Sequence, residues 1–215
     1  MKKLLFLAAS VCALSFPALS YAESVPSVVA AEKSMVENYS FDKAHTQILF
    51  FVDHLGFSKS QGEFHDYDGG FTFDRENPEN SMIDITIQTA SIDMDDKPWD
   101  DHMKNADFFN VEQFPSMTFK STSIEVTGEN TADITGDFTL LGVTKPVTLK
   151  VIHNKSDKHA FSGKYVAGFS ASAVIKRSEF GMEYGLPMVG DDVNVMIEVE
   201  AIRSEPEAEE MPVVE

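Results

Sequence analysis

The sequence predicts an all-β, antiparallel fold, a barrel or a sandwich of about eight to ten strands with one short helix between strands. Three observations carry this prediction. Apolar and polar residues alternate along many short segments, turn sequences separate these segments, and only one stretch shows helical spacing. The links are as short as those of hairpins, and because parallel strands need long crossovers, such links favour antiparallel pairing.

The clearest strand signals are four segments in which every second residue is apolar. Such alternation is typical of strands with one buried and one solvated face. These segments are residues 48–54, 83–88, 147–152 and 193–200, and further candidates lie at residues 62–65, 70–74, 117–126, 132–140 and 165–175. Turn residues separate them at residues 68–70, 77–80, 128–130, 141–143 and 190–192. We therefore expect the apolar faces to enclose a common interior.

One stretch, residues 98–109, departs from the alternation. Trp99, Met103 and Ala106 recur at helical spacing, and Pro98 suits the first position of a helix. Acidic residues surround this start, where a helix N-terminus favours negative charge. Two phenylalanines follow, and the alternation then returns. We expect a short helix that either covers the entrance of a barrel or serves as a plain crossover between strands.

The first 22 residues have the features of a cleavable signal peptide. Two lysines near the start precede an apolar run at residues 4–14, and Ser20-Tyr21-Ala22 gives a small-x-small cleavage site. We predict that the mature chain begins at Glu23 and is periplasmic. Cleavage would also remove Cys12, the only cysteine, so we expect no disulfide in the mature protein.

We expect one domain at residues 39–203, preceded by a polar linker at residues 23–38 and followed by an acidic disordered tail at residues 204–215. Loss of the two lysines in the signal peptide leaves 15 basic residues against 35 acidic ones, a formal charge of −20. This surplus argues against nucleic acid and against anionic lipid heads as partners. No later apolar run approaches the roughly 20 residues of a membrane span, so we expect no stable membrane insertion.

The histidines and carboxylates show no spacing that is typical of a metal or catalytic site. His45 and His54 are separated by an odd offset, which places them on opposite faces of an unbroken strand. The sequence has no H-x-H, H-E-x-x-H or G-x-S-x-G motif, and the acidic residues at 93–96 lack the rest of an EF-hand loop. We predict no catalytic residues, no metal, no cofactor and no enzyme activity.

Phenylalanine is abundant, with 17 in the chain. Six of them fall on predicted inward faces: Phe50, Phe64, Phe71, Phe73, Phe119 and Phe138. They would form either a solid core or the wall of a cavity, since an eight-stranded barrel is just wide enough for side chains or for one slender ligand. Arg177 continues an inward alternation on the last-but-one strand. It would pair there with a carboxylate such as Asp107 or contact a polar ligand head.

Five motifs follow one another along the predicted domain. They are YSFDKAHTQILFFVDHLGFSKSQGEF from Tyr39, ASID from Ala90, DHMKNADFFNVEQFPSMTFKST from Asp101, GDFTLLGVTKPVTL from Gly136 and IKRSEFGM from Ile175. With these motifs, residues 39–203 closely resemble the YceI-like family of exported, lipocalin-like proteins that bind polyisoprenoid lipids. The resemblance implies an extended eight-stranded antiparallel barrel with a long apolar tunnel. It also implies a carrier or storage role for a lipid such as an isoprenoid quinone or its polyprenyl precursor.

Position by position, the resemblance gives these candidates for the tunnel wall: Phe50, Val52, Phe64, Phe108, Phe119, Phe138 and Leu140. Six further ligand-binding candidates come from the predicted inward faces: Ile48, Phe71, Phe73, Ile85, Ile87 and Arg177. His45, His54, His102 and Arg177 also match the family pattern, as scaffold or mouth residues. Two other function classes stay open, an exported metal-dependent or hydrolytic enzyme and a stress-related structural protein without a ligand. The sequence also leaves open whether two chains form a homodimer.

Overall fold

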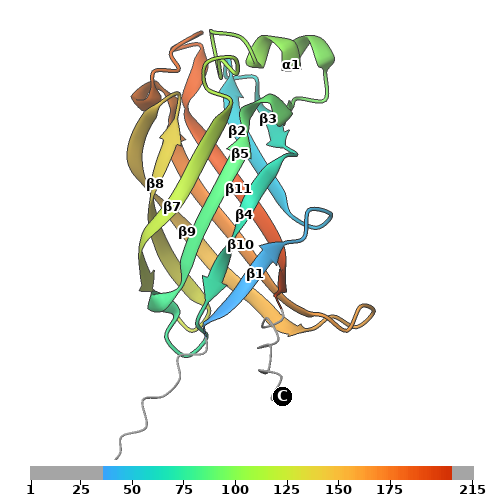
Figure 1. Cartoon of the computed structure of the whole chain (residues 1–215). Coiled ribbons are helices and arrows are strands. Elements are labelled where there is room, and N and C mark those ends of the chain that lie inside the picture. The colour runs from blue at the N-terminus through green and yellow to red at the C-terminus, as the bar shows by residue number, and fades with distance from the viewer. Residues whose placement is uncertain (1–35, 205–215) are drawn as a thin grey trace, which may run out of the picture. The chain divides into compact units, whose positions relative to one another are not determined.

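The computed structural model describes residues 36–204 and folds them into an antiparallel β-barrel with one α-helix (Figure 1). The strands are β1 (Glu37–Phe41), β2 (Gln47–His54), β3 (Ser58–Phe64), β4 (Tyr67–Phe73), β5 (Met82–Gln88), β6 (Ile92–Asp93), β7 (Ser116–Val126), β8 (Thr131–Leu140), β9 (Val143–Lys158), β10 (Tyr165–Lys176) and β11 (Val189–Arg203). The helix α1 (Lys97–Met103) lies between β6 and β7. Short 3₁₀ helices occupy Pro78–Asn80, Thr89–Ser91 and Arg177–Phe180.

The barrel has eight positions around its circumference. Their order is β1, β4, β5, β7, β8, β9, β10 and β11, and β11 pairs with β1 to close the ring. β11 is long enough to serve two partners, because Ala201 lies opposite Phe41 of β1 and Ile197 lies opposite Ile48 of β2. β2 pairs in turn with β3, and β3 with β6, so these strands extend the wall beyond β1 and β4. The antiparallel prediction is confirmed, and the fold is the barrel rather than the sandwich.

Burial along β8 shows how the sequence forms this wall. Ile134, Gly136, Phe138 and Leu140 are buried, and the residues between them are more exposed, which is the period of two that a strand imposes. The strand then turns into β9 through residues 141–142, both of which have positive φ, 50° for Leu141 and 74° for Gly142. Positive φ at both central residues is the geometry of a tight hairpin, so the turn fixes the register of β8 against β9.

The helix α1 begins with a side-chain cap. Asp96 accepts a hydrogen bond from the Trp99 N–H at 3.0 Å, and Met103 is the buried residue of the helix. We expected helical spacing to continue to Ala106, but the helix ends at Met103. The reason is local, because the Asn105 side chain accepts from the Asp107 N–H at 2.8 Å and turns the chain there. No helix within residues 36–204 is long and apolar enough to span a membrane.

Most connections between strands gather at the two ends of the barrel, whereas the loop between β1 and β2 projects from its side (Figure 1). One end, called the α1 end, carries α1, the β2–β3 turn at residues 55–57 and the connection from β10 to β11 at residues 177–188. The other, called the polar end, carries the turns at residues 74–81, 127–130 and 159–164. The α1 end is uppermost in Figure 1.

Some predicted bounds were wrong. β1 begins at Glu37, inside the segment expected to be a linker, because pairing with β4 and β11 makes a strand of a weakly patterned sequence. β3 begins at Ser58 and β4 at Tyr67, each before the expected start, and the two-residue strand β6 was not expected at all. The predicted signal peptide, and the tail beyond Ser204, lie outside the described residues.

Candidate functional site

The interior of the barrel is a cavity of about 630 Å³, formed by the inward faces of its strands. This volume falls in the range of about 300–1,000 Å³ that small-molecule sites occupy. The wall is overwhelmingly apolar. The hollow interior also decides between the two readings of the phenylalanines, because their rings form the wall of a cavity and not a solid core.

All thirteen residues predicted as ligand-binding candidates border this one cavity: Ile48, Phe50, Val52, Phe64, Phe71, Phe73, Ile85, Ile87, Phe108, Phe119, Phe138, Leu140 and Arg177. Within the wall the aromatic rings support one another, with centroids 5.7 Å apart between Phe50 and Phe64 and 5.4 Å apart between Phe64 and Phe109. Such separations are favourable for aromatic pairs. The wall is therefore built from rings that hold each other in place around an open centre.

Two glycines make room for these rings. A Cβ on Gly62 would lie 2.3 Å from the Phe50 ring, and a Cβ on Gly136 would lie 2.5 Å from the Phe119 ring. No real Cβ tolerates such distances, so each ring occupies the space that a side chain at the neighbouring glycine would need. This close approach keeps Phe50 and Phe119 against the wall and out of the centre of the cavity.

Part of the wall was not predicted. The faces of β9, β10 and β11 complete the cavity with small and medium apolar residues: Val147, Leu149, Val151, Ala171, Ala173, Ile175, Val193, Val195, Ile197 and Val199. Most of these residues showed the same alternation in the sequence as β2 and β5. The signal was therefore present, but the choice of candidates gave weight to phenylalanine. The two alanines widen the cavity halfway along β10.

At the α1 end the wall becomes aromatic and exposed. His54 lies 6.5 Å from the Trp99 ring, and Tyr184 packs edge-on against both His102 and Phe108 at 5.4 and 5.3 Å. All five side chains border the cavity. Of the histidines predicted as scaffold or mouth residues, His54 and His102 lie at this end together with the helix segment, whereas His45 does not border the cavity. Tyr184 carried no signal in the sequence because it belongs to an irregular connection.

Arg177 is buried at the α1 end, with 3% of its surface exposed. Its guanidinium donates to four backbone carbonyls, those of Met182, Tyr184, Val189 and Gly190, at 2.8 to 3.0 Å. Burial lowers its pKa from the ordinary value, and the nearby charge of Asp191 partly opposes this effect. The side chain therefore ties the β10–β11 connection to the barrel.

The predicted pairing of Arg177 with Asp107 is wrong. Asp107 lies instead beside His102, with 3.4 Å between its carboxylate and the imidazole Nε2. Arg177 has no need of a direct carboxylate partner, because four carbonyl dipoles satisfy most of its N–H groups. The inward direction that the alternation indicated was correct, and the partner was not.

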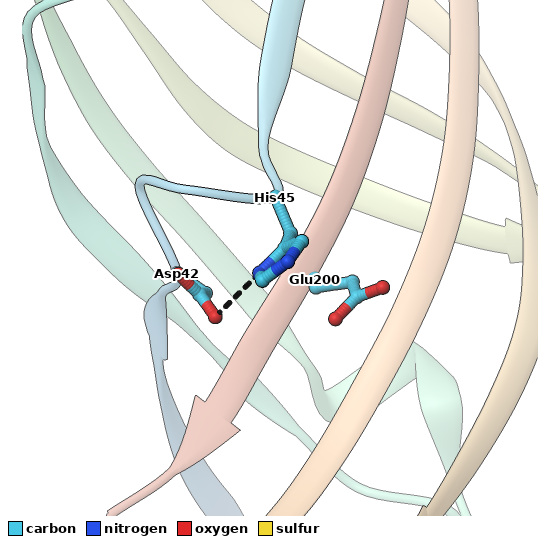
Figure 2. Close-up of side chains that lie close together, drawn as sticks. All are labelled: Asp42, His45 and Glu200. Atoms are coloured by element: carbon cyan, nitrogen blue, oxygen red, sulfur yellow. Dashed lines mark hydrogen bonds and ion pairs between the residues drawn. The ribbon is translucent and has the colours of Figure 1, made fainter. Parts of the chain in front are cut away.

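Two groups of potential metal ligands lie on the outer wall. In Figure 2, Asp42 and His45 are joined by a hydrogen bond of 3.0 Å, and Glu200 lies beside them. The second group joins His65 to Glu63 and Asp93, with Nε2 of the histidine 3.5 and 3.1 Å from their carboxylates. The sequence argument looked for fixed ligand motifs and did not combine His45 with Asp42 or His65 with Glu63, so it missed both groups. Neither group borders the cavity.

The hydrogen bond that the His45 imidazole donates to the Asp42 carboxylate, together with the negative charges of Asp42 and Glu200, raises the pKa of His45 above its ordinary value. The same contact with His45 leads the causes that lower the pKa of Asp42. Both effects describe an exposed ion pair that forms when the histidine is protonated. Such a pair contributes little to stability, because solvent screens it.

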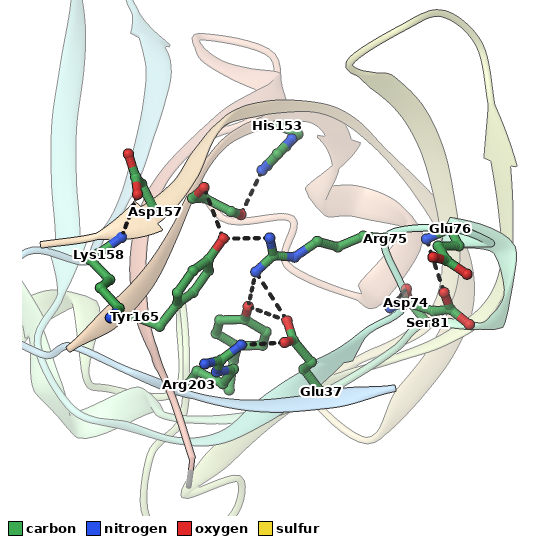
Figure 3. Close-up of polar contacts among 12 residues, drawn as sticks. Glu37, Asp74, Arg75, Glu76, Ser81, His153, Asp157, Lys158, Tyr165 and Arg203 are labelled. Carbon is green, nitrogen blue, oxygen red and sulfur yellow. Dashed lines mark hydrogen bonds and ion pairs between the residues drawn. The ribbon is translucent and has the colours of Figure 1, made fainter. Parts of the chain in front are cut away.

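The polar end is held by a network of charged and aromatic side chains (Figure 3). The Arg75 guanidinium donates to the Glu37 carboxylate and to the Tyr39 hydroxyl, each at 3.1 Å, and also to the Tyr165 hydroxyl. Arg203 donates to the same carboxylate from β11. The two guanidinium groups lie 4.4 and 4.3 Å from the centre of the Tyr165 ring. Glu37 therefore links two arginines where β1 closes the barrel.

His153 connects this network to the cavity. Its ring lies 5.4 Å from Phe73 and 5.1 Å from Phe169, and its Nε2 is 2.8 Å from the Ser156 hydroxyl. Burial, reinforced by the charge of Arg75, lowers the pKa of His153 below its ordinary value. The histidine therefore favours its neutral form at the boundary between the apolar wall and the polar end.

The family model of the YceI-like domain matches residues 39–201. A UPF0312 protein of Ectopseudomonas mendocina is 40% identical over 179 residues, which cover 82% of this chain and 93% of that protein. The match therefore spans the barrel and nearly all of the relative.

Solved structures from several organisms share the fold. BcnA of Burkholderia cenocepacia superposes with a TM-score of 0.68 at 24% identity, covering 74% of this chain and 98% of that one. A domain from Saccharophagus degradans, described as polyisoprenoid binding and implicated in plant cell wall breakdown, superposes with a TM-score of 0.59 at 13% identity, covering 78% and 99%. At these identities the likeness concerns the fold. The likeness in fold agrees with the family match over nearly the whole barrel. The chain therefore belongs to the YceI-like family.

Proposed function

We propose that this protein is a periplasmic carrier that holds one long-chain polyisoprenoid lipid, a polyprenyl compound or an isoprenoid quinone, inside its barrel. The observation that carries the proposal is the apolar cavity of about 630 Å³ that runs between the two ends. The polyisoprenoid binding ascribed to the structurally similar Saccharophagus domain supports the choice of lipid. The predicted signal peptide supports the location.

The energetics favour a flexible apolar chain. At about 0.8 kcal/mol for each buried CH₂, a chain of about 20 carbons has a gross burial energy of about 16 kcal/mol. This approaches the non-covalent ceiling of about 18–21 kcal/mol, so the ordering of the chain offsets part of it. The remainder is sufficient for a ligand that stays bound through purification. A single barrel encloses the whole cavity, so a homodimer is not needed for binding.

A binding protein explains the site better than an enzyme does. The two arginines that border the cavity are engaged in holding the fold, since Arg177 donates to four carbonyls and Arg75 joins Glu37, Tyr39 and Tyr165. The two groups of potential metal ligands on the outer wall, around His45 and His65, do not border the cavity. A structural protein without a ligand would be expected to fill its interior, because protein cores are close-packed.

Phe119 and Phe138 provide the test. They lie opposite each other on β7 and β8, and both are buried in the cavity wall. The parent protein, Phe119→Ala and Phe138→Ala are purified, checked for folding by melting temperature and extracted with organic solvent. We expect at least a tenfold loss of bound isoprenoid in each folded variant. Phe161→Ala is the matched control, because Phe161 is 97% exposed at the polar end. Folded variants that retain as much lipid as the parent would show that the cavity assignment is wrong.

A further inference from the structure

Five large apolar side chains are exposed together at the α1 end. They are Leu55, Phe57, Trp99, Tyr184 and Met188, with exposed fractions of 46, 89, 36, 49 and 64%. These five residues form what we call the aromatic rim. Single exposed apolar residues are common on proteins, but a group gathered around one opening indicates an interaction surface.

Three separate segments bring the rim together. The β2–β3 turn supplies Leu55 and Phe57, and the Leu55 N–H donates to the Met188 carbonyl of the β10–β11 connection at 3.0 Å. The helix α1 supplies Trp99, whose ring neighbours His54 at the start of the same turn. Because backbone hydrogen bonds and the Asp96 cap fix these segments, the rim is a preformed surface.

The rim continues directly into the cavity. Trp99 and Tyr184 belong to both, because they are exposed and also border the cavity. An apolar ligand that passes this end therefore stays in contact with apolar side chains from the surface to the interior. At the polar end, by contrast, the cavity meets Arg75 and the turn at residues 128–130.

The chemistry of the rim fits a lipid surface. Tryptophan and tyrosine favour the interface between water and hydrocarbon, where their polar atoms stay hydrated and their rings are buried. The chain carries a formal charge of −18, so it would be repelled by anionic lipid heads. Two carboxylates beside the rim accept hydrogen bonds from the backbone, Asp53 from the Gly56 N–H at 2.9 Å and Asp100 from the Met94 N–H at 2.7 Å.

We infer that the aromatic rim seats the barrel, α1 end first, on the surface of a zwitterionic phospholipid bilayer, so that the lipid cargo moves between bilayer and cavity without crossing water. This inference rests on the proposed function for its cargo. The contact is shallow and reversible, because five side chains reach only the interfacial layer. It needs no charge attraction and no transmembrane segment.

The single tryptophan of the chain is Trp99, so its fluorescence reports on the rim and the adjoining mouth of the cavity. The protein is recovered from the periplasmic fraction and mixed with vesicles of pure phosphatidylcholine. We expect a blue shift of the emission and quenching by brominated lipid in the bilayer. Phe57→Ser and Met188→Ser should each weaken vesicle partitioning, Phe57→Ser by about tenfold or more, since burial of one phenylalanine is worth at least that factor.

Phe161→Ser is the matched control, because Phe161 is equally exposed at the opposite end. An equal loss in Phe161→Ser would overturn the inference, since binding would then reflect general apolar surface. Binding only to phosphatidylglycerol vesicles would also overturn it. So would a dimer that depends on Phe57 in the absence of vesicle binding, because the rim would then serve a second copy.

The same samples separate this inference from the proposed function. A protein that yields isoprenoid on extraction but shows no change in Trp99 emission with vesicles overturns the docking and leaves the carrier function standing. A protein that docks through Phe57 and never yields isoprenoid supports the docking and overturns the carrier function.

Discussion

The two ends of the barrel solve different problems with different chemistry. The polar end closes the ring of strands, and it uses a charged network in which Glu37 joins Arg75 to Arg203. The α1 end presents exposed aromatic residues, and its connections are tied by single side chains such as Arg177 and Asp96. One barrel can therefore be closed by a charged network at one end and present an apolar surface at the other. The predicted direction of lipid passage follows from this difference.

The largest effect is expected at Arg177. Arg177→Met would leave four backbone carbonyls, two in the β10–β11 connection and two at the start of β11, without their donor, and we expect a loss of about 3–5 kcal/mol in the free energy of unfolding. Arg177→Lys should recover only part of it, because one ammonium cannot reach all four oxygens. Lys176→Met is the control, since its exposed pair with Asp192 should contribute less than about 1 kcal/mol. Urea unfolding measures all three, and equal effects of Arg177→Met and Lys176→Met would contradict the role assigned to Arg177.

A substitution between the two ends tests whether the ligand spans them. Ala171 borders the cavity midway along β10, and Ala171→Phe should fill the passage there. We expect retention of a long-chain isoprenoid to fall about tenfold or more while a short isoprenoid alcohol such as geraniol still binds at the α1 end. Ser172→Phe is the matched control, because Ser172 is exposed on the outer wall. Long-chain retention that is unchanged in Ala171→Phe would show that the chain does not pass this point.

The polar end should be sensitive to acid. Burial raises the pKa of Glu37, but the Tyr39 hydrogen bond and the two arginines outweigh it, so the folded pKa lies below the ordinary value of 4.5. A lowered pKa contributes stability that is present above pH 4.5 and is lost as the pH falls through the folded pKa. Glu37→Gln should therefore cost about 1–2 kcal/mol at pH 7 and less at pH 3. Glu125→Gln, at an exposed position, is the control, and an equal cost at both pH values would contradict the account.

The smallest effect is expected on the outer wall, between the two ends. The groups around His45 and His65 are exposed, and we predict that neither holds a metal on which the fold depends. EDTA should leave the melting temperature of the exported protein unchanged within about one degree. A loss of several degrees that one divalent metal restores, and that His65→Ala abolishes, would show that the prediction is wrong.

Much of the fold could be predicted from sequence because a barrel strand leaves a local signal. The alternation of Ile48, Phe50 and Val52 shows the inward face of β2, and the same pattern identified β5, β9 and β11. The short strands β1 and β6 had no such signal, since pairing with distant strands determines them. The family resemblance supplied the number of strands and the choice of ligand.

The polar end could not be predicted for a physical reason. Glu37, Arg75, Tyr165 and Arg203 belong to four separate elements, and only the closure of the barrel brings them together. The same is true of most of the aromatic rim, because all of its residues except Trp99 of α1 lie in connections without periodicity. Arg177 is intermediate, because its direction followed from alternation and its partners from the path of an irregular connection.

Native mass spectrometry of the exported protein tests the central claim most directly. Protein purified without detergent or added lipid is ionised by electrospray as the intact complex, and its mass is compared with that of the same sample after organic extraction. The account predicts an excess of one ligand per chain, with the mass of a long-chain isoprenoid compound, that extraction removes. A chain that carries no excess mass, or that carries only ordinary phospholipid or a metal ion, would contradict it.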